Sequence, residues 1–401
     1  MRKISVLVSS IGHGGAEKIM ARIAALIAEN REINVELVVV SHINGDIRRS
    51  LPSRLNVIEL NAKHYMSTLK PLYEAIISKK FFPAVGLAFK TVFWLWKKTL
   101  APIVGYIKSS RPDIIFTTHY NSVTILANWL AGSPAQIVIT EHTVLSRHFS
   151  SQIWFIRKFF PAICRFFYPK AKQVIGVSKY VADDLVSYLG ISKDKVCYIY
   201  NPIVGRVLDK MASENSTHLW LDRHAPVFMA IGRMSPEKDF HTLLKAFSLF
   251  RGRMEARLMM IGDGPLMHCL REYTDELNVS DFVDWLGFVD NPIPYIKMVD
   301  VLVISSRYEG LPTVVIEALS VGTTIVAADC PGGIREILGD DEYGYLVPVD
   351  SPEEMAEMMM FALDNPYPKE KLRSRAEIFS DGNSLQSYLC LIDDLLTEPR
   401  R

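Results

Sequence analysis

Two basic residues follow an apolar run near the middle of the chain and could bind phosphate. Arg233 and Lys238 stand five residues apart, after the run 227–231. Arginine presents a fork of donors to phosphate oxygens and lysine a compact positive charge, so the pair could hold a diphosphate and stabilise the charge that develops on it. We expect both side chains to be solvent-accessible, although such a pair alone is more often ordinary solvated surface.

Two carboxylates surround a later turn. Glu309 follows the run 301–305, and Glu317 falls within a segment that Pro312 predicts to begin as a helix. Carboxylates accept hydrogen bonds from sugar and ribose hydroxyls, while the free N–H groups of a helix start favour phosphate. Capping or solvation would explain either Glu alone. The residues expected to line this turn and helix start are Gly310, Leu311, Pro312 and Thr313.

A glycine-rich turn near the N-terminus is a further candidate. Gly12, Gly14 and Gly15 follow the run 4–9 and precede a helix-length segment. Glycines let a backbone approach a ligand closely, and a helix N-terminus favours an anion. A tight structural turn is the alternative. A dinucleotide-binding fingerprint fits poorly, because the glycine spacing differs and the next apolar run ends without an acidic residue.

The elements that must position these residues alternate between β-branched runs and helix-length amphipathic segments, which is typical of parallel α/β structure. Ligands of such sheets bind at the carboxyl ends of the strands, where most of these residues lie. Two sets of strands predict two doubly wound, Rossmann-like domains, with a boundary near Asn201. The expected strands are 4–9, 35–41, 57–60, 113–117, 135–140, 173–177 and 196–200, then 227–231, 257–261, 283–286, 301–305 and 324–328.

Length and composition allow two well-packed domains. The chain has 401 residues, of which 49% are hydrophobic and 22% charged. Its five cysteines are scattered and form no Cys-x-x-Cys pair, which argues against a disulfide framework or zinc site and for a reducing compartment. No uncharged apolar stretch reaches the roughly 18 residues of a spanning helix. We therefore expect a cytoplasmic protein.

Charge is distributed unevenly. Residues 1–200 carry 26 Lys and Arg against 12 Asp and Glu, a net +14, and the remainder carries 19 against 32, a net −13. The first half should therefore face an anionic partner. Nucleic acid is one candidate, but the aromatic and basic residues mixed in 79–98 and 153–172 favour an anionic membrane surface. Helices packed on the sheet with a charged outer face are the alternative.

Three motifs, taken in order, resemble the GT4 family of retaining glycosyltransferases, which have the GT-B fold with two domains facing across a cleft. They are Gly-Arg-x4-Lys at 232–238, Gly-Asp-Gly-Pro at 262–265 and Glu-Gly-x6-Glu at 309–317. Gly-Gly-Ala-Glu at 14–17 also looks like the family, and the resemblance covers nearly the whole chain. Asp239 stands where relatives often have Gly, which affects the local turn more than the role of the lysine.

The resemblance assigns donor-site roles by position. Arg233 and Lys238 match the pair that binds the donor diphosphate. Glu309 matches a residue contacting donor-sugar hydroxyls, and Glu317 matches one holding the ribose. The glycine-rich N-terminal turn matches the loop beneath the phosphates.

Other residues match the family on the first-domain side. His119, after the strand expected at 113–117, matches the active-site histidine beside the donor sugar. Glu141 and His142 look like a polar element that many relatives place at the acceptor side, with a capping or core hydrogen bond as the alternative. No two Asp residues stand two positions apart, so the Asp-x-Asp pattern of metal-using transferases is absent and neither metal nor cofactor is expected.

The implied reaction moves a hexose or N-acetylhexosamine, with retention, from a nucleotide sugar such as a UDP-sugar to a lipid-linked or cell-envelope saccharide. The diphosphate would leave from the face that the acceptor attacks, without a protein nucleophile. Residues 1–200 would bind the acceptor and the inner face of the plasma membrane. Residues 201–375 would bind the donor, and 376–401 would pack back on the first domain. A nucleotide-sugar epimerase of the same fold and a non-catalytic sugar-nucleotide-binding scaffold are the alternatives.

Overall fold

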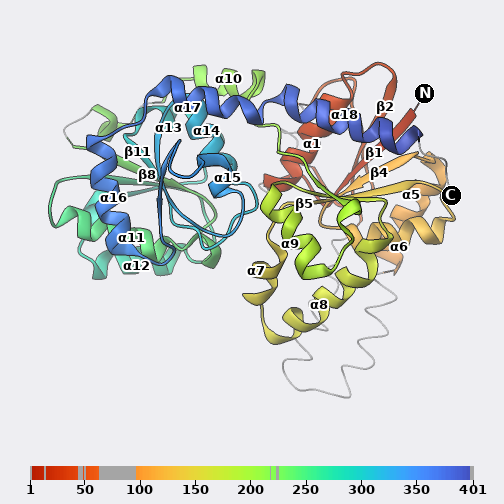
Figure 1. The fold of residues 1–401 in the computed structure, drawn as a ribbon, viewed down its shortest axis with the longest axis horizontal. Coiled ribbons are helices and arrows are strands. Elements are labelled where there is room, and N and C mark those ends of the chain that lie inside the picture. Colours follow the sequence, from red (N-terminus) through yellow and green to blue (C-terminus); the bar gives the residue numbers. More distant parts are fainter. Residues whose placement is uncertain are drawn as a thin grey trace. The chain divides into compact units, whose positions relative to one another are not determined.

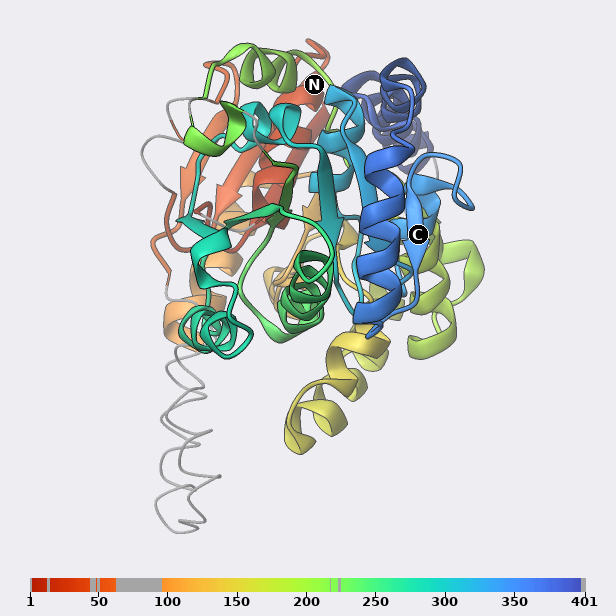
Figure 2. The ribbon, with the colours of Figure 1, turned by 90° about the vertical axis from the view of Figure 1, so that its left-hand side faces the viewer.

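The computed structural model describes residues 2–12, 15–43, 48, 51–62, 96–216, 218–222 and 225–397, which form two compact units (Figure 1). The first unit takes in the described residues of Met1–Gly176, Ala182–Ile199 and Leu385–Arg401. The second takes in those of Val177–Val181 and Tyr200–Ser384. Each unit contains one parallel β-sheet with helices on both faces, as two views show (Figures 1 and 2).

The described part of the first unit has a seven-stranded sheet in the order β3-β2-β1-β4-β5-β6-β7. Every neighbouring pair is parallel, and the central strands are buried along nearly their whole length, as expected of strands covered on both faces. The strands are β1 Arg2–Val8, β2 Ile33–Val39, β3 Asn56–Glu59, β4 Ile114–Thr117, β5 Gln136–Glu141, β6 Gln173–Gly176 and β7 Val196–Tyr198.

Helices cover both faces of this sheet, and α1 packs against it through one apolar face. In α1, Ile19, Ile23 and Ile27 recur every four residues and are buried. Helix α6 ends at Gly132, whose φ of 61° suits glycine as a helix terminator. The helices are α1 Gly15–Ile27, η1 Trp96–Leu100, α5 Ala101–Ser110, α6 Asn121–Ala131, α7 Leu145–Ser150, α8 Trp154–Phe167, α9 Lys179–Leu189 and α18 Asp381–Thr397, of which α9 and α18 run from one unit into the other.

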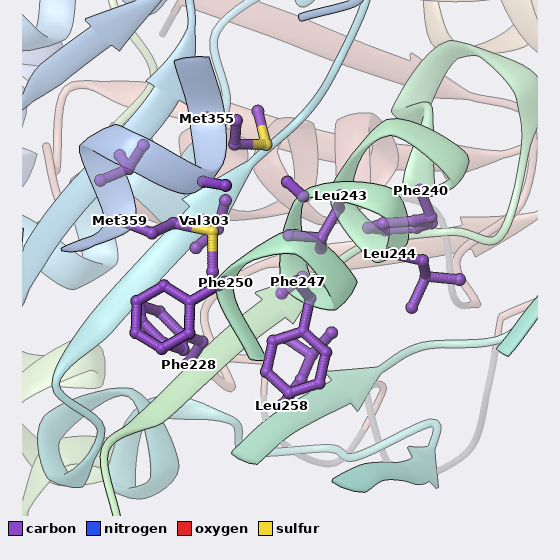
Figure 3. Close-up of a cluster of buried hydrophobic side chains, with 14 of the residues drawn as sticks. Phe228, Phe240, Leu243, Leu244, Phe247, Phe250, Leu258, Val303, Met355 and Met359 are labelled. Carbon is purple, nitrogen blue, oxygen red and sulfur yellow. The ribbon is translucent and has the colours of Figure 1, made fainter. Parts of the chain in front are cut away.

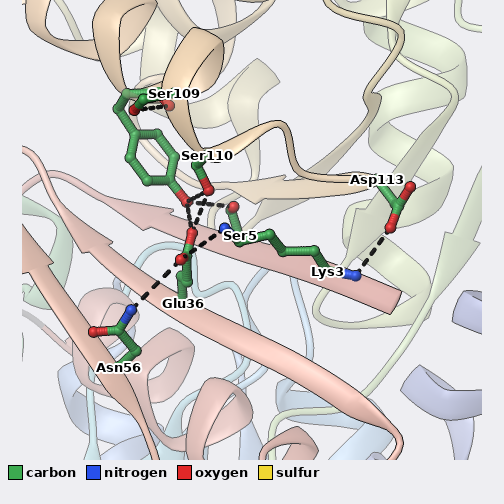
Figure 4. A network of polar contacts seen from close by, with 8 residues as sticks. Lys3, Ser5, Glu36, Asn56, Ser109, Ser110 and Asp113 are labelled. Atoms are coloured by element: carbon green, nitrogen blue, oxygen red, sulfur yellow. Dashed lines mark hydrogen bonds and ion pairs between the residues drawn. The ribbon is translucent and has the colours of Figure 1, made fainter. Parts of the chain in front are cut away.

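A polar network ties α5 to the first two strands (Figure 4). The buried Glu36 carboxylate accepts a hydrogen bond from Tyr106 Oη at 2.6 Å and one from Ser110 Oγ at 2.5 Å, and it pairs with Lys3 Nζ at 3.0 Å. Burial tends to raise the pKa of Glu36, but these donors lower it below its ordinary value. A carboxylate buried with several donors holds its surroundings in one arrangement.

The described part of the second unit has a six-stranded parallel sheet in the order β10-β9-β8-β11-β12-β13. Its strands are β8 Val227–Ile231, β9 Arg257–Ile261, β10 Val283–Gly287, β11 Val301–Ile304, β12 Thr324–Ala328 and β13 Tyr345–Val347. Its main helices are α10 Arg206–Ser213, α11 Phe240–Arg251, α12 Met267–Glu276, α13 Ile293–Met298, α14 Thr313–Val321, α15 Ile334–Leu338, α16 Pro352–Asp364 and α17 Lys369–Ala376.

The core of the second unit lies between α11, α16 and the sheet (Figure 3). Helix α11 points Leu243, Phe247 and Phe250 inward, and none of them is exposed to solvent. The rings of Phe250 and of Phe228 on β8 meet edge to face, with 4.9 Å between the ring centres. Because β8 is fixed from this side, the turn that follows it has a rigid base.

The predicted strands are confirmed, with ends that shift by one or two residues. Strand β13 was not expected, because its three residues are too short to give a pattern. Helix α14 begins at Thr313, so Pro312 lies at the N-cap and not in the first turn as expected. Among the described helices, none is long and apolar enough to cross a lipid bilayer.

Candidate functional site

The candidate residues of the second unit gather where its chain order reverses. Strand β8 is the first in sequence but lies between β9 and β11, so the connections leaving β8 and β11 run to opposite sides. Such a switch point leaves a crevice at the carboxyl ends of the two strands. The segment 232–239 leaves β8 and the segment 305–313 leaves β11, which brings together two stretches about 70 residues apart.

Lys238 and Glu309 form an ion pair at this switch point. Lys238 Nζ lies 2.5 Å from Glu309 Oε1, and the two side chains are 21% and 12% exposed. Ser306 Oγ donates to the same oxygen at 2.6 Å, and Ser305 Oγ donates to the Lys238 carbonyl at 2.8 Å. Burial would lower the pKa of Lys238, but the Glu309 carboxylate outweighs it and raises that pKa. The lysine is therefore cationic.

Glycines keep the surrounding turns in close contact. Gly332, after β12, has a φ of 130°, and a Cβ there would lie 1.6 Å from the Glu309 carbonyl oxygen. Gly262, after β9, also has a φ of 130°, and its Cβ would lie 1.9 Å from the Gly232 carbonyl oxygen. Only glycine permits these approaches. The Gly-Asp-Gly-Pro turn thus packs directly under the Gly-Arg turn.

The turn after Lys238 is formed by Asp239, at the position where the resembled family often has glycine. Its backbone is left-handed, with φ 48° and ψ 47°, a conformation that Asp tolerates better than most residues. Its carboxylate accepts a hydrogen bond from Thr242 Oγ1 at 2.7 Å and pairs with Arg307 at 3.3 Å. The Arg307 backbone N–H also donates to the Glu237 carbonyl at 2.8 Å. Arg307 therefore joins the β8 turn to the β11 turn.

The remaining donor-site candidates lie around this pair. Arg233 is exposed, as expected, whereas Lys238 is only partly accessible, with 21% of its side chain exposed. Gly310, Leu311 and Pro312 are buried. Helix α14 has no side-chain cap on its first N–H groups, so its N-terminus can accept an anion, and Glu317 lies one turn into it.

The first unit has an equivalent switch point between β1 and β4, where His119 lies. Its ring nitrogen Nδ1 is 3.0 Å from Glu17 Oε1, and Ser9 Oγ donates to that same oxygen at 2.8 Å. Burial tends to raise the pKa of Glu17, but the hydrogen bonds from His119 and Ser9 lower it to about 2. Burial likewise tends to lower the pKa of His119, but Glu17 and Glu141 raise it. The Glu17 carboxylate therefore favours the protonated form of the His119 ring.

Glu141 is buried at the end of β5, and His142, which follows it, is half-buried. Glu141 Oε2 accepts hydrogen bonds from Tyr168 Oη at 2.8 Å and Asn121 Nδ2 at 3.2 Å. Burial raises the pKa of Glu141 to about 7 and lowers that of His142 to about 3. His142 Nε2 and Asn121 Oδ1 are buried without a hydrogen-bond partner among the described residues. Contact of Glu141 or His142 with an acceptor stays a prediction.

The glycine-rich turn is partly described. Gly12 and Gly15 lie on either side of residues 13–14, so the predicted contact of Gly14 falls outside the described residues. A Cβ at Gly12 or Gly15 would meet no atom of the described residues within 4 Å, so packing against those residues does not demand glycine there. Within the described residues, no three His, Cys, Asp or Glu side chains are grouped to ligate a metal ion.

Comparison with known proteins decides the family. A model described as "Glycosyltransferase Family 4" matches residues 13–204, and one described as "Glycosyl transferases group 1" matches residues 215–379. The chain belongs to the GT4-type glycosyltransferases. The predicted family and enzyme class are thereby confirmed.

Two relatives of this glycosyltransferase come from Campylobacter jejuni. One is N-acetylgalactosamine-N,N'-diacetylbacillosaminyl-diphospho-undecaprenol 4-alpha-N-acetylgalactosaminyltransferase, which is 26% identical over 94% of this chain and 96% of its own. The other is GalNAc-alpha-(1->4)-GalNAc-alpha-(1->3)-diNAcBac-PP-undecaprenol alpha-1,4-N-acetyl-D-galactosaminyltransferase, which is 24% identical over 98% and 99%. Both matches run along nearly the full length of either chain.

Solved structures confirm the GT-B fold. HepE of Anabaena in complex with UDP-glucose is 18% identical, with a TM-score of 0.73 over 98% of this chain and 100% of its own. Sucrose-phosphate synthase of Thermosynechococcus elongatus is 17% identical, with a TM-score of 0.74 over 99% of both chains. At this identity the likeness concerns the fold alone.

Sequence reasoning missed several residues that hold the glycosyltransferase's candidate site. Ser306 and Arg307 lie inside the Glu-Gly segment, but nothing in their spacing shows that they bridge to Glu309 and Asp239. Glu17 stands in the Gly-Gly-Ala-Glu motif, yet it was given no role. Its position in the first turn of a helix after a glycine-rich turn was the available signal.

Proposed function

We propose that this glycosyltransferase moves a hexose or N-acetylhexosamine, with retention, from a UDP-sugar to a lipid-linked or cell-envelope saccharide. The observation that carries the proposal is the Lys238–Glu309 pair beside the uncapped start of α14, at the switch point between β8 and β11. Cationic, anionic and N–H donor groups there match a ligand with phosphates and hydroxyls side by side. The substrates stated in the names of the relatives support the substrate classes.

The second unit would hold the donor. Arg233 and Lys238 would bind the diphosphate, with the first N–H groups of α14 adding to the positive potential. Glu309 would accept hydrogen bonds from the sugar and Glu317 from the ribose. Gly310, Leu311, Pro312 and Thr313 would shape the wall of the site, and no metal ion or cofactor takes part.

The first unit would hold the acceptor, and its β1 turn would approach the phosphates through Gly12, Gly14 and Gly15. In the transfer, the bond between the sugar's anomeric carbon and the diphosphate oxygen breaks while the acceptor oxygen bonds to the same face of that carbon. The acceptor's hydroxyl proton passes to the departing diphosphate. Arg233 and Lys238 stabilise the charge that the diphosphate gains, and His119 donates a hydrogen bond beside the sugar.

Membrane contact is part of the proposal, because a lipid-linked acceptor lies at a bilayer. Helix α8, at the outer edge of its unit in two views (Figures 1 and 2), exposes large apolar side chains to 42–62%. Between residues 142 and 182 the chain has seven Lys and Arg and no acidic residue. Lys170 Nζ lies 3.8 Å from the centre of the Phe166 ring. The exposed apolar residues of α8 are Trp154, Phe159, Ile163 and Phe166.

Aromatic side chains interleaved with cations and no anions fit the headgroup region of an anionic leaflet. The protein would therefore work in the cytoplasm at the inner face of the plasma membrane. The other predicted segment, 79–98, lies outside the described residues except for 96–98.

Two assays test the proposal. Nucleotide sugars should raise the melting temperature selectively, with a UDP-sugar the most effective, because a ligand that binds only the native state stabilises it. With an undecaprenyl-diphosphate-linked saccharide present, UDP should be released and the α-anomeric configuration of the donor should persist in the product by NMR. A product of inverted configuration would contradict retention, and a preference for another nucleotide would contradict the UDP-sugar donor.

For the membrane, Phe159→Ser with Phe166→Ser should weaken sedimentation with anionic vesicles by about one to two orders of magnitude, from the lost apolar burial. The matched control is Phe361→Ser, which removes a side chain that is 50% exposed in the second unit. Equal vesicle binding by the double variant and the wild type would refute the α8 surface and leave the transfer reaction untouched.

A further inference from the structure

His119 sits on a strained piece of backbone. Its φ is 60°, in the left-handed region, and the Tyr120 N–H donates to the Thr118 carbonyl at 2.7 Å. A hydrogen bond between residues i and i+2, with a positive φ at the residue between them, defines the rare form of γ-turn. A non-glycine residue in that region carries backbone strain, which is found most often at functional sites. Glycine would relieve the strain, yet the chain has a histidine whose side chain is 44% exposed.

Within the part of the chain that the structure describes, Glu17 is the one side chain hydrogen-bonded to the histidine ring. Glu17 faces Nδ1 from the first turn of α1, and Ser9, just after β1, holds the Glu17 carboxylate through the same oxygen. Three separate segments therefore meet at this ring: the β1 end, the α1 start and the β4 end. With Nδ1–H donated to Glu17, the second ring nitrogen, Nε2, is left to donate elsewhere.

We infer that Glu17 is a positioning residue for the transfer: together with Ser9 it holds Nδ1 of His119 and aims Nε2–H away from α1. The inference rests on the proposed function, because the group that Nε2–H meets would be an oxygen of the donor sugar. Glu17 itself touches no substrate, and no proton leaves His119 during the reaction. The imidazolium contributes a charged hydrogen-bond donor, which is stronger than a neutral one.

Other titratable groups near the ring act in known directions. Glu141, on β5, adds negative charge that also favours the imidazolium. His142, which follows Glu141 in the chain, is half-buried and has its pKa lowered to about 3 by desolvation, so it is neutral at working pH and does not repel His119. Glu17 is the nearest of these groups and the one in direct contact.

The test compares Glu17→Gln with Glu17→Asp and with Glu29→Gln, which removes an exposed carboxylate just after α1. Glu17→Gln keeps the size of the side chain and loses the charge, so kcat should fall about 10- to 100-fold through misplacement of the donor group. The alkaline limb of the kcat/KM profile should move to lower pH, since a nearby anion that favours the imidazolium is gone. Glu17→Asp should restore part of the rate, and Glu29→Gln should match the wild type.

NMR titration of His119 provides a reading that needs no turnover. The wild-type ring should titrate above its ordinary pKa and the Glu17→Gln ring at least half a unit lower. Adding Glu17→Gln to His119→Ala should cost no further rate. Unchanged His119 titration in Glu17→Gln, or additive losses in the double variant, would overturn the positioning role. Absence of any sugar transfer by the wild type, with the titration shift intact, would instead refute the proposed function.

Discussion

Replacing Lys238 by Met separates the structural from the chemical contribution of one residue. The substitution keeps most of the apolar stem and removes the ammonium, which leaves the Glu309 carboxylate with the Ser306 hydroxyl. Breaking a buried pair on one side costs about 3–5 kcal/mol. Because the two side chains are still 21% and 12% exposed, water compensates part of the loss, and we expect about 2–3 kcal/mol.

A loss of that size should lower the melting temperature by about 5–10 °C for a unit of this size. Adding Glu309→Gln to Lys238→Met removes the unpaired anion, so the double variant should melt above Lys238→Met. Turnover should not recover with it. Without the charge beside the diphosphate, transfer should fall about tenfold to a thousandfold in both variants.

Thermal melts and UDP release on the same preparations measure the two effects, with Lys297→Met as the control because Lys297 is exposed on α13. Equal melting temperatures for Lys238→Met and the wild type would show that the ion pair contributes no stability. Additive destabilisation in the double variant would show that the two groups are not coupled. Wild-type turnover in Lys238→Met would remove the diphosphate assignment.

Three further outcomes are expected. Gly332→Ala should destabilise by about 2 kcal/mol or more and impair transfer, since its Cβ would collide with the Glu309 carbonyl. Gly382→Ala should leave stability unchanged, because a Cβ there meets no atom of the described residues within 4 Å, and equal melting temperatures for the two variants would contradict the Gly332 contact. Relative to Glu141→Gln, the wild type should lose stability as pH rises from about 4.5 to 7, because the pKa of Glu141 is raised to about 7 in the folded state. Relative to His142→Gln, the wild type should gain stability as pH rises from about 3 to 6.5, because the pKa of His142 is lowered to about 3. Stability changes of the same sign in both comparisons would refute these assignments. Transfer should persist in EDTA, and a loss restored only by a divalent cation would show that a metal is needed.

The sheets and the edge that carries the site could be predicted from sequence because their signal is local. Each strand is a short run of β-branched and apolar residues, and the residues that end it must lie at the sheet's carboxyl edge. Lys238 and Glu309 were assigned to one site on that basis. Their direct ion pair, which makes Lys238 largely buried, was not predicted, because it depends on how two turns 71 residues apart approach each other.

The pairing of Glu17 with His119 shows the same limit more strongly. The two residues are 102 positions apart, and their contact requires β1 and β4 to be neighbours, which follows from the order of the sheet and not from any local pattern. The left-handed backbone at His119 was also not predicted, because a positive φ is uncommon even for histidine, which adopts it more often than most residues.

The two switch points hold their polar groups by the same physical means. In the second unit a cation lies on a carboxylate that a serine also holds, and in the first unit an imidazole lies on a carboxylate that a serine also holds. In each case one carboxylate oxygen accepts from both groups, which fixes the direction of the positively charged donor before any ligand arrives. Such preorganisation is the form in which electrostatic stabilisation of a transition state costs least at the moment of reaction. A glycosyl transfer that builds negative charge on a diphosphate beside a sugar would use both donors, one for the leaving group and one for the sugar.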